Sequence, residues 1–145
     1  MSYKDLASEL LNSMQSLHKA RPHKHINEAL QGEAFVLHFI AHHDHDVMPS
    51  EISQEMDVSS ARIAFALNSL ARKKLITRHI NIKDRRKVIV KATEKGKELA
   101  DTQYDAVIAA IVNLLKLLGE SDAREYIRIT DKLADIAQSI ASNNT

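Results

Sequence analysis

The stretch that decides the fold is SEISQEMDVSSARIAFALNSLARKKLITRHINIKDRRKVIVKATEKGKEL, residues 50–99. Ser50 is a good N-cap for a short helix in which Ile52 and Met56 lie on one face. A tight turn follows, and Ser59 can then cap a second helix. Two short helices joined by a tight turn predict a helix-turn-helix.

The second of these helices has two chemically different faces. Ile63, Ala66, Leu67 and Leu70 fall on one side and predict contact with a core. A recognition helix presents its N-terminal turn and its outer face to the major groove of DNA. The positions that could touch DNA are therefore Ser59, Ser60, Ala61, Arg62, Phe65 and Ser69.

Three of these positions decide how such a helix would read DNA. Arg62 suits a guanine edge or a phosphate, with a solvated helix arginine as the alternative. Phe65 can meet a thymine methyl group but cannot hydrogen-bond a base edge, and it could instead pack on a neighbouring element. Ser59 caps the helix and can also contact a phosphate, because helix N-termini attract anions.

Two β-rich segments follow the helix pair, LITRHI at residues 75–80 and KVIVKA at residues 87–92. They predict a hairpin, or wing, with a strongly charged tip. The charge is carried by Lys83, Asp84, Arg85, Arg86 and Lys87. Such a loop suits phosphates and the narrow minor groove, where an inserted arginine reads groove width. The alternative is a charged hairpin that only protects a sheet edge.

Helices are expected before this segment. The first has an apolar stripe at steps of three and four residues, formed by Tyr3, Leu6, Leu10, Met14 and Leu17. Pro22 ends that helix near Arg21, and residues 22–31 predict a short connection. Residues 32–43 are apolar on several sides, which predicts a helix buried at the centre of the domain.

Two more helices are expected after it. Thr93 and Glu94 begin the first, which runs to a C-cap at Gly119, and Ser121 with Asp122 begins the second. The second carries the apolar stripe Tyr126, Ile129, Leu133, Ile136 and Ile140. Stripes at both ends of the chain exceed what one winged helix-turn-helix can cover, so the terminal helices predict a dimer interface.

These elements predict a mainly α fold, a winged helix-turn-helix with a small β-hairpin wing. The 145 residues fit a single domain, 1–145. Within it we expect residues 32–98 to form the DNA-binding lobe, and residues 1–31 and 99–145 to form the dimerisation helices.

Charge and composition narrow the function. Residues 47–98 carry a net charge of +6 and the remainder −5, so a basic segment lies within an acidic frame and predicts a polyanion partner. The chain has no cysteine, which removes disulfides and thiolate chemistry. No signal peptide or membrane span is evident, so a cytoplasmic protein is expected. No catalytic motif is present, so we expect no enzyme and no required cofactor.

The segment AHHDHDVMPSEI, residues 41–52, raises the question of a metal site. His38 and His42 are four residues apart, so on a helix both project from one face, as two ligands of a zinc ion would need. His43, Asp44, His45 and Asp46 cannot all bind the same ion, because successive residues diverge around a helix. A polar helix end with a turn, a regulatory metal site, and a pH-sensitive or ligand-contacting His38 remain alternatives.

Taken together, the segment from Ser50 to Leu99 resembles the MarR family of winged-helix transcription regulators. The wing DRR at Asp84 to Arg86 and the T-x-x-G at Thr93 to Gly96 match the family's signature in place and spacing. The helices before and after fit as well, so the resemblance covers essentially the whole chain. The sequence departs from the family at Lys74, where Gly is common, at Asn81 for Asp, at Ala92 for Leu, and at Phe65 for a basic or polar residue.

The resemblance implies a homodimer that binds double-stranded DNA, usually as a repressor on a pseudo-palindromic operator. It also implies release of DNA when a small ligand, often an aromatic acid, an oxidant or a metal, is bound. In the wing, it implies that Asp84 holds Arg86, which enters the minor groove. The alternatives are a metal-responsive regulator that uses His38 and His42, and a winged-helix adaptor that binds protein without DNA.

Overall fold

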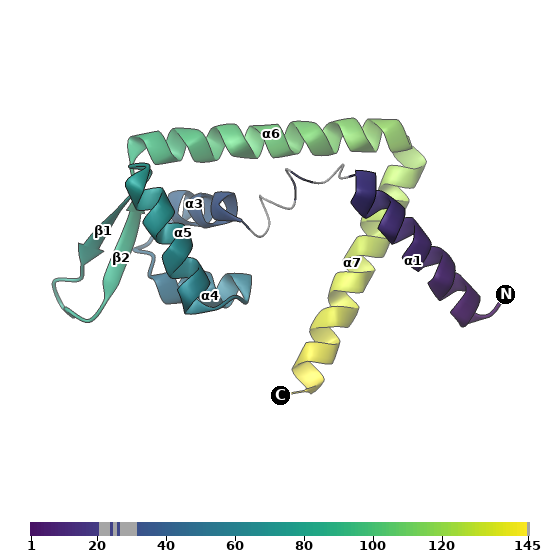
Figure 1. Ribbon diagram of the computed structural model, residues 1–145, viewed down its shortest axis with the longest axis horizontal. Coiled ribbons are helices and arrows are strands. Elements are labelled where there is room, and N and C mark those ends of the chain that lie inside the picture. Colours follow the sequence, from purple (N-terminus) through teal and green to yellow (C-terminus); the bar gives the residue numbers. More distant parts are fainter. Residues whose placement is uncertain (21–23, 25, 27–31, 145) are drawn as a thin grey trace. The chain divides into compact units, whose positions relative to one another are not determined.

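The computed structural model describes residues 1–20, 24, 26 and 32–144. Within them the chain forms six helices and a two-stranded antiparallel sheet (Figure 1). The elements are α1 (Tyr3–Ala20), α3 (Glu33–His42), α4 (Pro49–Met56), α5 (Ser60–Arg72), β1 (Ile76–Ile80), β2 (Val88–Ala92), α6 (Glu94–Leu118) and α7 (Glu120–Asn143). This order confirms the mainly α winged helix-turn-helix, while most of the predicted connection over residues 22–31 lies outside the described residues.

The chain divides into two compact units, Met1–Val107 and Ile108–Thr145. The first contains the winged lobe, whose core lies between α3, α4, α5 and the hairpin. Buried apolar side chains from each of these elements form that core: Val36, Leu37, Ile40, Ile52, Ile63, Leu67, Leu70, Ile76 and Val90. Each such side chain contributes about 1.5–3 kcal/mol by leaving water, so this cluster holds the recognition helix in place.

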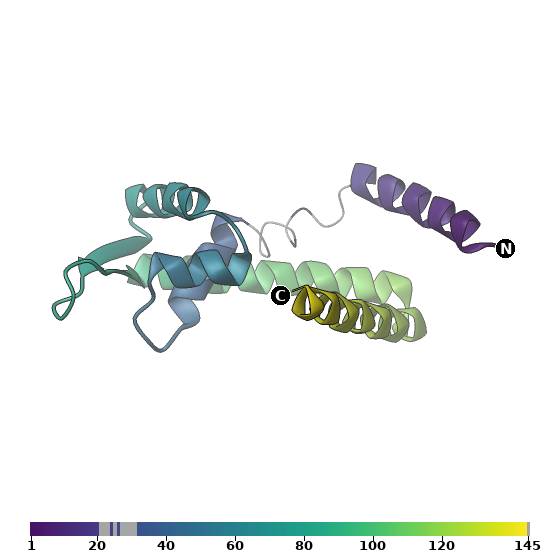
Figure 2. The same ribbon diagram turned by 90° about the horizontal axis from the view of Figure 1, so that it is seen from below.

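The hairpin pairs Ile76 with Ala92 at its base and Ile80 with Val88 towards its tip. The backbone N–H of Val90 also donates to the carbonyl of Val47 at 2.9 Å, which ties the loop before α4 to the wing. Figure 2 shows the hairpin projecting beyond the three helices of the lobe. The wing is therefore anchored at its base and free at its tip.

The predicted capping role of Ser50 is wrong. Helix α4 begins with Pro49, and its N-cap is Met48, two residues before the predicted cap. Proline fits this first helical position because its missing N–H would have no partner there. The Glu51 side chain reaches back to accept the Met48 backbone N–H at 3.1 Å, so the acidic residue, rather than a serine hydroxyl, satisfies the helix start.

Lys74 and Gly96 form the corner between α5, the hairpin and α6. Lys74 has φ +60°, a left-handed conformation that favours glycine, the residue usual at this position in the MarR family. A Cβ added to Gly96 would lie 2.0 Å from the carbonyl oxygen of Leu75, so no other residue fits. Thr93 Oγ1 donates to the Lys74 carbonyl at 2.8 Å and accepts the Gly96 N–H at 3.0 Å. The T-x-x-G motif is thus a structural clamp.

The second unit contains the end of α6 and the whole of α7, between which the chain turns sharply at Gly119 (Figure 1). Gly119 has φ +85°, and its N–H donates to the carbonyl of Leu115 at 3.1 Å, which confirms the predicted C-cap. Helix α7 begins at Glu120, ahead of the predicted start at Ser121 and Asp122, because Gly119 also serves as its N-cap.

Candidate nucleic-acid interface

The outer face of α5 carries the positions expected to read DNA. Ser59 Oγ accepts the backbone N–H of Arg62 at 3.2 Å, which confirms the N-cap and fixes the start of the helix. Ser59, Ser60, Ala61 and Arg62 are all exposed. Phe65 is 75% exposed, so among the described residues it is not packed against a neighbouring element and its ring is open to a partner.

Ser69 behaves differently from the other predicted contacts. It is only half-buried, and it lies near the carboxylate of Glu33 on α3. Lys73 Nζ donates to the same carboxylate at 2.9 Å. Burial alone would raise the pKa of Glu33, but the nearby Ser69 hydroxyl and the hydrogen bond from Lys73 lower it below its usual value. Glu33 therefore pins the recognition helix to α3.

The wing tip is held by its own side chains. Asn81 Oδ1 accepts the backbone N–H of Lys83 at 2.9 Å, so asparagine does here what the more common aspartate could do. Asp84 Oδ1 accepts the backbone N–H of Arg86 at 3.0 Å. Among the described residues Asp84 forms no ion pair with the Arg86 guanidinium, so the aspartate positions the arginine through the backbone and leaves its head group free. Lys83, Arg85 and Lys87 are also exposed.

Two contacts at this interface join side chains of different elements. Arg78 on β1 donates through its guanidinium to Asn68 Oδ1 on α5, which links the wing to the recognition helix. The Glu33 contact with Lys73 spans 40 residues. Sequence reasoning missed Glu33, Asn68 and Arg78, because no local pattern marks a side-chain pair between two elements.

The histidine-rich loop after α3 is an ordered polar turn. His43 Nδ1 donates to the Phe39 carbonyl at 2.6 Å, and His45 Nε2 donates to Glu51 at 2.9 Å. The hydrogen bond to Glu51 raises the pKa of His45 above its usual value. Because Glu51 also accepts from the start of α4, this pair couples the loop to the first helix of the helix-turn-helix.

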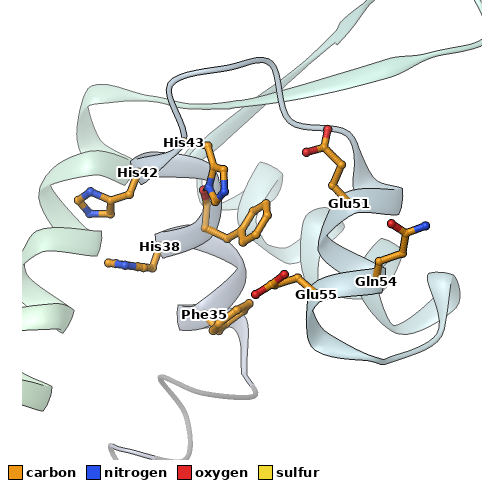
Figure 3. A pocket seen from close by; sticks show the side chains of 8 residues that line it. Phe35, His38, His42, His43, Glu51, Gln54 and Glu55 are labelled. Carbon is orange, nitrogen blue, oxygen red and sulfur yellow. The ribbon is translucent and has the colours of Figure 1, made fainter. Parts of the chain in front are cut away.

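The two histidines predicted as metal candidates do lie together on α3 (Figure 3). The rings of His38 and His42 are 4.2 Å apart, His42 Nε2 lies 3.3 Å from an Asp101 carboxylate oxygen, and His38 stacks on Tyr104 at 5.4 Å. Burial, followed by the neighbouring His42, lowers the pKa of His38. Over the part of the chain that the structure describes, no group of three or more metal-ligating side chains could hold an ion.

The comparisons with known proteins agree with this geometry. Residues 31–96 match the family model described as a winged helix DNA-binding domain. The chain is 29% identical over 148 residues to the HTH-type transcriptional repressor MdtR of Bacillus subtilis, covering 96% of this chain and 92% of that protein.

Two solved structures extend the likeness to the fold. The crystal structure of MarR has a TM-score of 0.65 at 21% identity and covers 99% of this chain and 95% of its own. Streptococcus pneumoniae FabT, solved in complex with DNA, has a TM-score of 0.63 at 21% identity, with 96% of this chain and 99% of that chain covered. In the residues that the structure describes, no helix is long and apolar enough to cross a membrane.

Proposed function

We propose that this chain, which carries a winged helix DNA-binding domain and is similar to the transcriptional repressor MdtR, is a DNA-binding regulator of the MarR type and a ligand-responsive repressor. It acts in the cytoplasm as a homodimer on a pseudo-palindromic operator, with one lobe of each copy in each half-site. The observation that carries the proposal is the pairing, on one lobe, of an exposed recognition face on α5 with a wing tip of free cations.

The contacts proposed for DNA fall into two classes. Ser59, Ser60, Ala61, Arg62, Phe65 and Ser69 on α5 face the major groove, with Arg62 on a base edge or phosphate and Phe65 on a thymine methyl group. Ser69 is the weakest member, since it is half-buried and not fully open to DNA. Lys83, Asp84, Arg85, Arg86 and Lys87 form the wing contribution, in which the cations meet phosphates and the minor groove.

The proposed dimer rests on apolar surface that the described chain leaves uncovered. Helix α1 has no buried residue, and its stripe includes Leu10 at 61% exposure. On α7, Leu133 is 61% exposed and only Ala123 is buried. Long apolar stripes left in water are unfavourable and typical of association surfaces. We therefore assign residues 1–31 and 99–145 to dimerisation and residues 32–98 to DNA binding.

A footprint on the DNA upstream of its own gene would test the proposed function and define an operator. With that DNA, Arg86→Ala should weaken binding to specific and unrelated duplexes alike, because the wing contacts backbone and groove shape. The charge-matched control is Lys97→Ala, on an exposed position at the start of α6 that belongs neither to the proposed DNA contacts nor to the proposed dimerisation segments. Equal affinity of Arg86→Ala and wild type in a gel-shift titration would remove the wing from the mechanism.

Salt provides an independent check. Each phosphate neutralised by a lysine or arginine gives a slope of about −0.9 in a plot of log affinity against log salt concentration. A dimer that uses several wing cations per copy should therefore lose affinity steeply as salt rises, and Arg86→Ala should flatten that slope. A shallow slope for the wild type would favour the adaptor alternative, in which the lobe binds protein.

A further inference from the structure

An open cavity of about 620 Å³ lies between α3 and α4, inside the winged lobe (Figure 3). It is separate from the outer face of α5 and from the wing. Both α3 and α4 pack on α5, so the cavity lies between two helices that support the recognition helix. None of the DNA contacts proposed above lines it, which leaves its side chains without an assigned role.

The α3 side of the cavity is an aromatic wall. The rings of Phe35 and Phe39 are 6.2 Å apart, and Phe39 stacks on the His43 ring at 3.8 Å. His43 is fixed by the hydrogen bond from its Nδ1 to the Phe39 carbonyl. Fixed aromatic faces suit a flat ring, and their negative π faces attract positive charge.

The α4 side of the cavity carries carboxylates. Glu51 is already used, since its two oxygens accept hydrogen bonds from Met48 N–H and His45. Glu55 has no hydrogen-bond or ion-pair partner among the described residues, and Figure 3 shows its carboxylate reaching from α4 towards Phe35. The cavity therefore holds one uncompensated negative charge next to an aromatic wall.

Nothing on the cavity wall offers an anion a strong partner. Among the described residues, no lysine or arginine lines it. Burial and the neighbouring His42 lower the pKa of His38, which keeps that ring neutral near pH 7. The His42 ring faces the Asp101 carboxylate at 3.3 Å, so any positive charge on it is already paired. An aromatic carboxylate would meet repulsion from Glu55, and the only imidazole left for it in the described part of the chain is that of His43, whose Nδ1 is already bonded to Phe39.

We propose that this cavity is the effector site of the regulator and that it selects a planar aromatic cation. The ring lies against Phe35 and Phe39, and the positive charge faces Glu55. The expected effect on DNA binding rests on the proposed function. A ligand between α3 and α4 changes the spacing of these two helices and so biases the placement of α5. The charge preference is opposite to the aromatic acids common among effectors of this family.

Two ligands of similar size and opposite charge test the selectivity directly. N-methylquinolinium and 2-naphthoate are both flat, two-ring ions, and their binding to the full chain can be compared by isothermal titration calorimetry at pH 7.5. We expect the cation to bind and the anion to bind at least about tenfold more weakly, because the Glu55 carboxylate attracts the cation and repels the anion. Equal binding of both ions, or tighter binding of 2-naphthoate, would overturn the proposal.

Variants locate the site. Glu55→Gln should weaken N-methylquinolinium binding by about tenfold, because the neutral amide removes the facing charge. Glu98→Gln removes an exposed carboxylate of α6 that does not line the cavity, and it should leave binding unchanged. Both variants keep the shape of the side chain, and thermal melting confirms that they fold. Equal losses in both would mean that only net charge matters, which contradicts the site.

The effect on DNA is measured separately. N-methylquinolinium should reduce operator binding by the wild type in a gel shift, and Glu55→Gln should need about tenfold more of it. If calorimetry shows cation binding while operator affinity stays constant, the cavity is not the effector site. If the chain binds no DNA at all, the proposed function fails, while calorimetry still decides whether the cavity selects cations.

Discussion

The winged lobe buries its apolar residues, whereas helix α7 leaves its apolar stripe exposed to water. In the lobe, α3, α4, α5 and the hairpin bury side chains such as Leu37 and Ile52 to 1% and 0% exposure. In α7 the stripe of Tyr126, Ile129, Leu133, Ile136 and Ile140 stays 43–61% exposed. The first region covers its apolar residues within one chain, while the second leaves its stripe in water. Fold stability therefore resides in the lobe, and the uncovered stripe is the surface that the proposed dimer would bury.

The largest effect is expected in the first region, at the clamp between α5 and α6. Gly96→Ala places a Cβ 2.0 Å from the Leu75 carbonyl oxygen. This clash is relieved only if the backbone moves. We expect a loss of several kcal/mol in the free energy of unfolding, measured by urea denaturation. Gly119→Ala is the comparison variant, because a Cβ there meets nothing within 4 Å and only the backbone conformation, φ 85° with ψ 157°, costs about 1–3 kcal/mol.

The next effect should appear only in the region with the uncovered stripe. Leu133→Asp puts a charge in the middle of the α7 stripe, so it should convert a dimer to monomers without unfolding the lobe. Sedimentation velocity gives the mass, and circular dichroism gives the helix content. A variant that stays dimeric would show that α7 lies outside the interface, and the account of the uncovered stripe would be wrong.

A gain in stability is expected at Lys74. Its φ of +60° is strained for a residue with a Cβ, and Lys74→Gly removes that strain. The gain should be about 0.5–1 kcal/mol, because glycine also raises the entropy of the unfolded chain and offsets part of the relief. A decrease in the urea midpoint would mean that the Lys74 side chain makes a contribution larger than the strain.

The smallest effect concerns the histidine loop and depends on pH. The hydrogen bond to Glu51 raises the pKa of His45 above 6.5, so its contribution is complete below pH 6.5 and is lost as pH rises through the raised pKa. The same hydrogen bond lowers the pKa of Glu51 below 4.5, so its contribution is complete above pH 4.5 and is lost as pH falls through the lowered pKa.

His45→Gln should therefore lose stability relative to wild type mainly between about pH 4.5 and 6.5, and much less at pH 8. Thermal melting across this range measures the difference. His18→Gln, on an exposed position of α1, controls for the loss of any histidine. A pH-independent difference for His45→Gln would show that the loop is held by its backbone and not by the ion pair.

Much of the fold could be predicted because it depends on local patterns. The apolar spacing of Ile63, Leu67 and Leu70 gave the buried face of α5, and the cap at Ser59 gave its start. The start of α4 was predicted wrongly because Ser50 competes with a proline at the first helical position and with the reach of Glu51 to Met48. Two capping signals that place the N-cap two residues apart cannot be ranked from sequence alone.

The candidate site also combines features that follow from local patterns with contacts between distant residues. The exposed cations of the wing and of α5 could be predicted, because charge density and helix faces are read directly from the chain. The contact between Glu33 and Lys73 could not, since it joins α3 to the C-cap of α5 across 40 residues. Nor could the cavity, because Phe35 and Glu55 face each other only after α3 and α4 have packed on α5.

We propose that a self-sufficient lobe reads DNA and that the terminal helices bring two lobes to one operator. Light scattering on the complex with the footprinted duplex, for wild type and Leu133→Asp side by side, is the decisive experiment. We expect two chains per duplex for the wild type, and a large loss of affinity for the folded Leu133→Asp monomer. One chain per duplex, or a monomeric variant that binds as tightly as wild type, would contradict it.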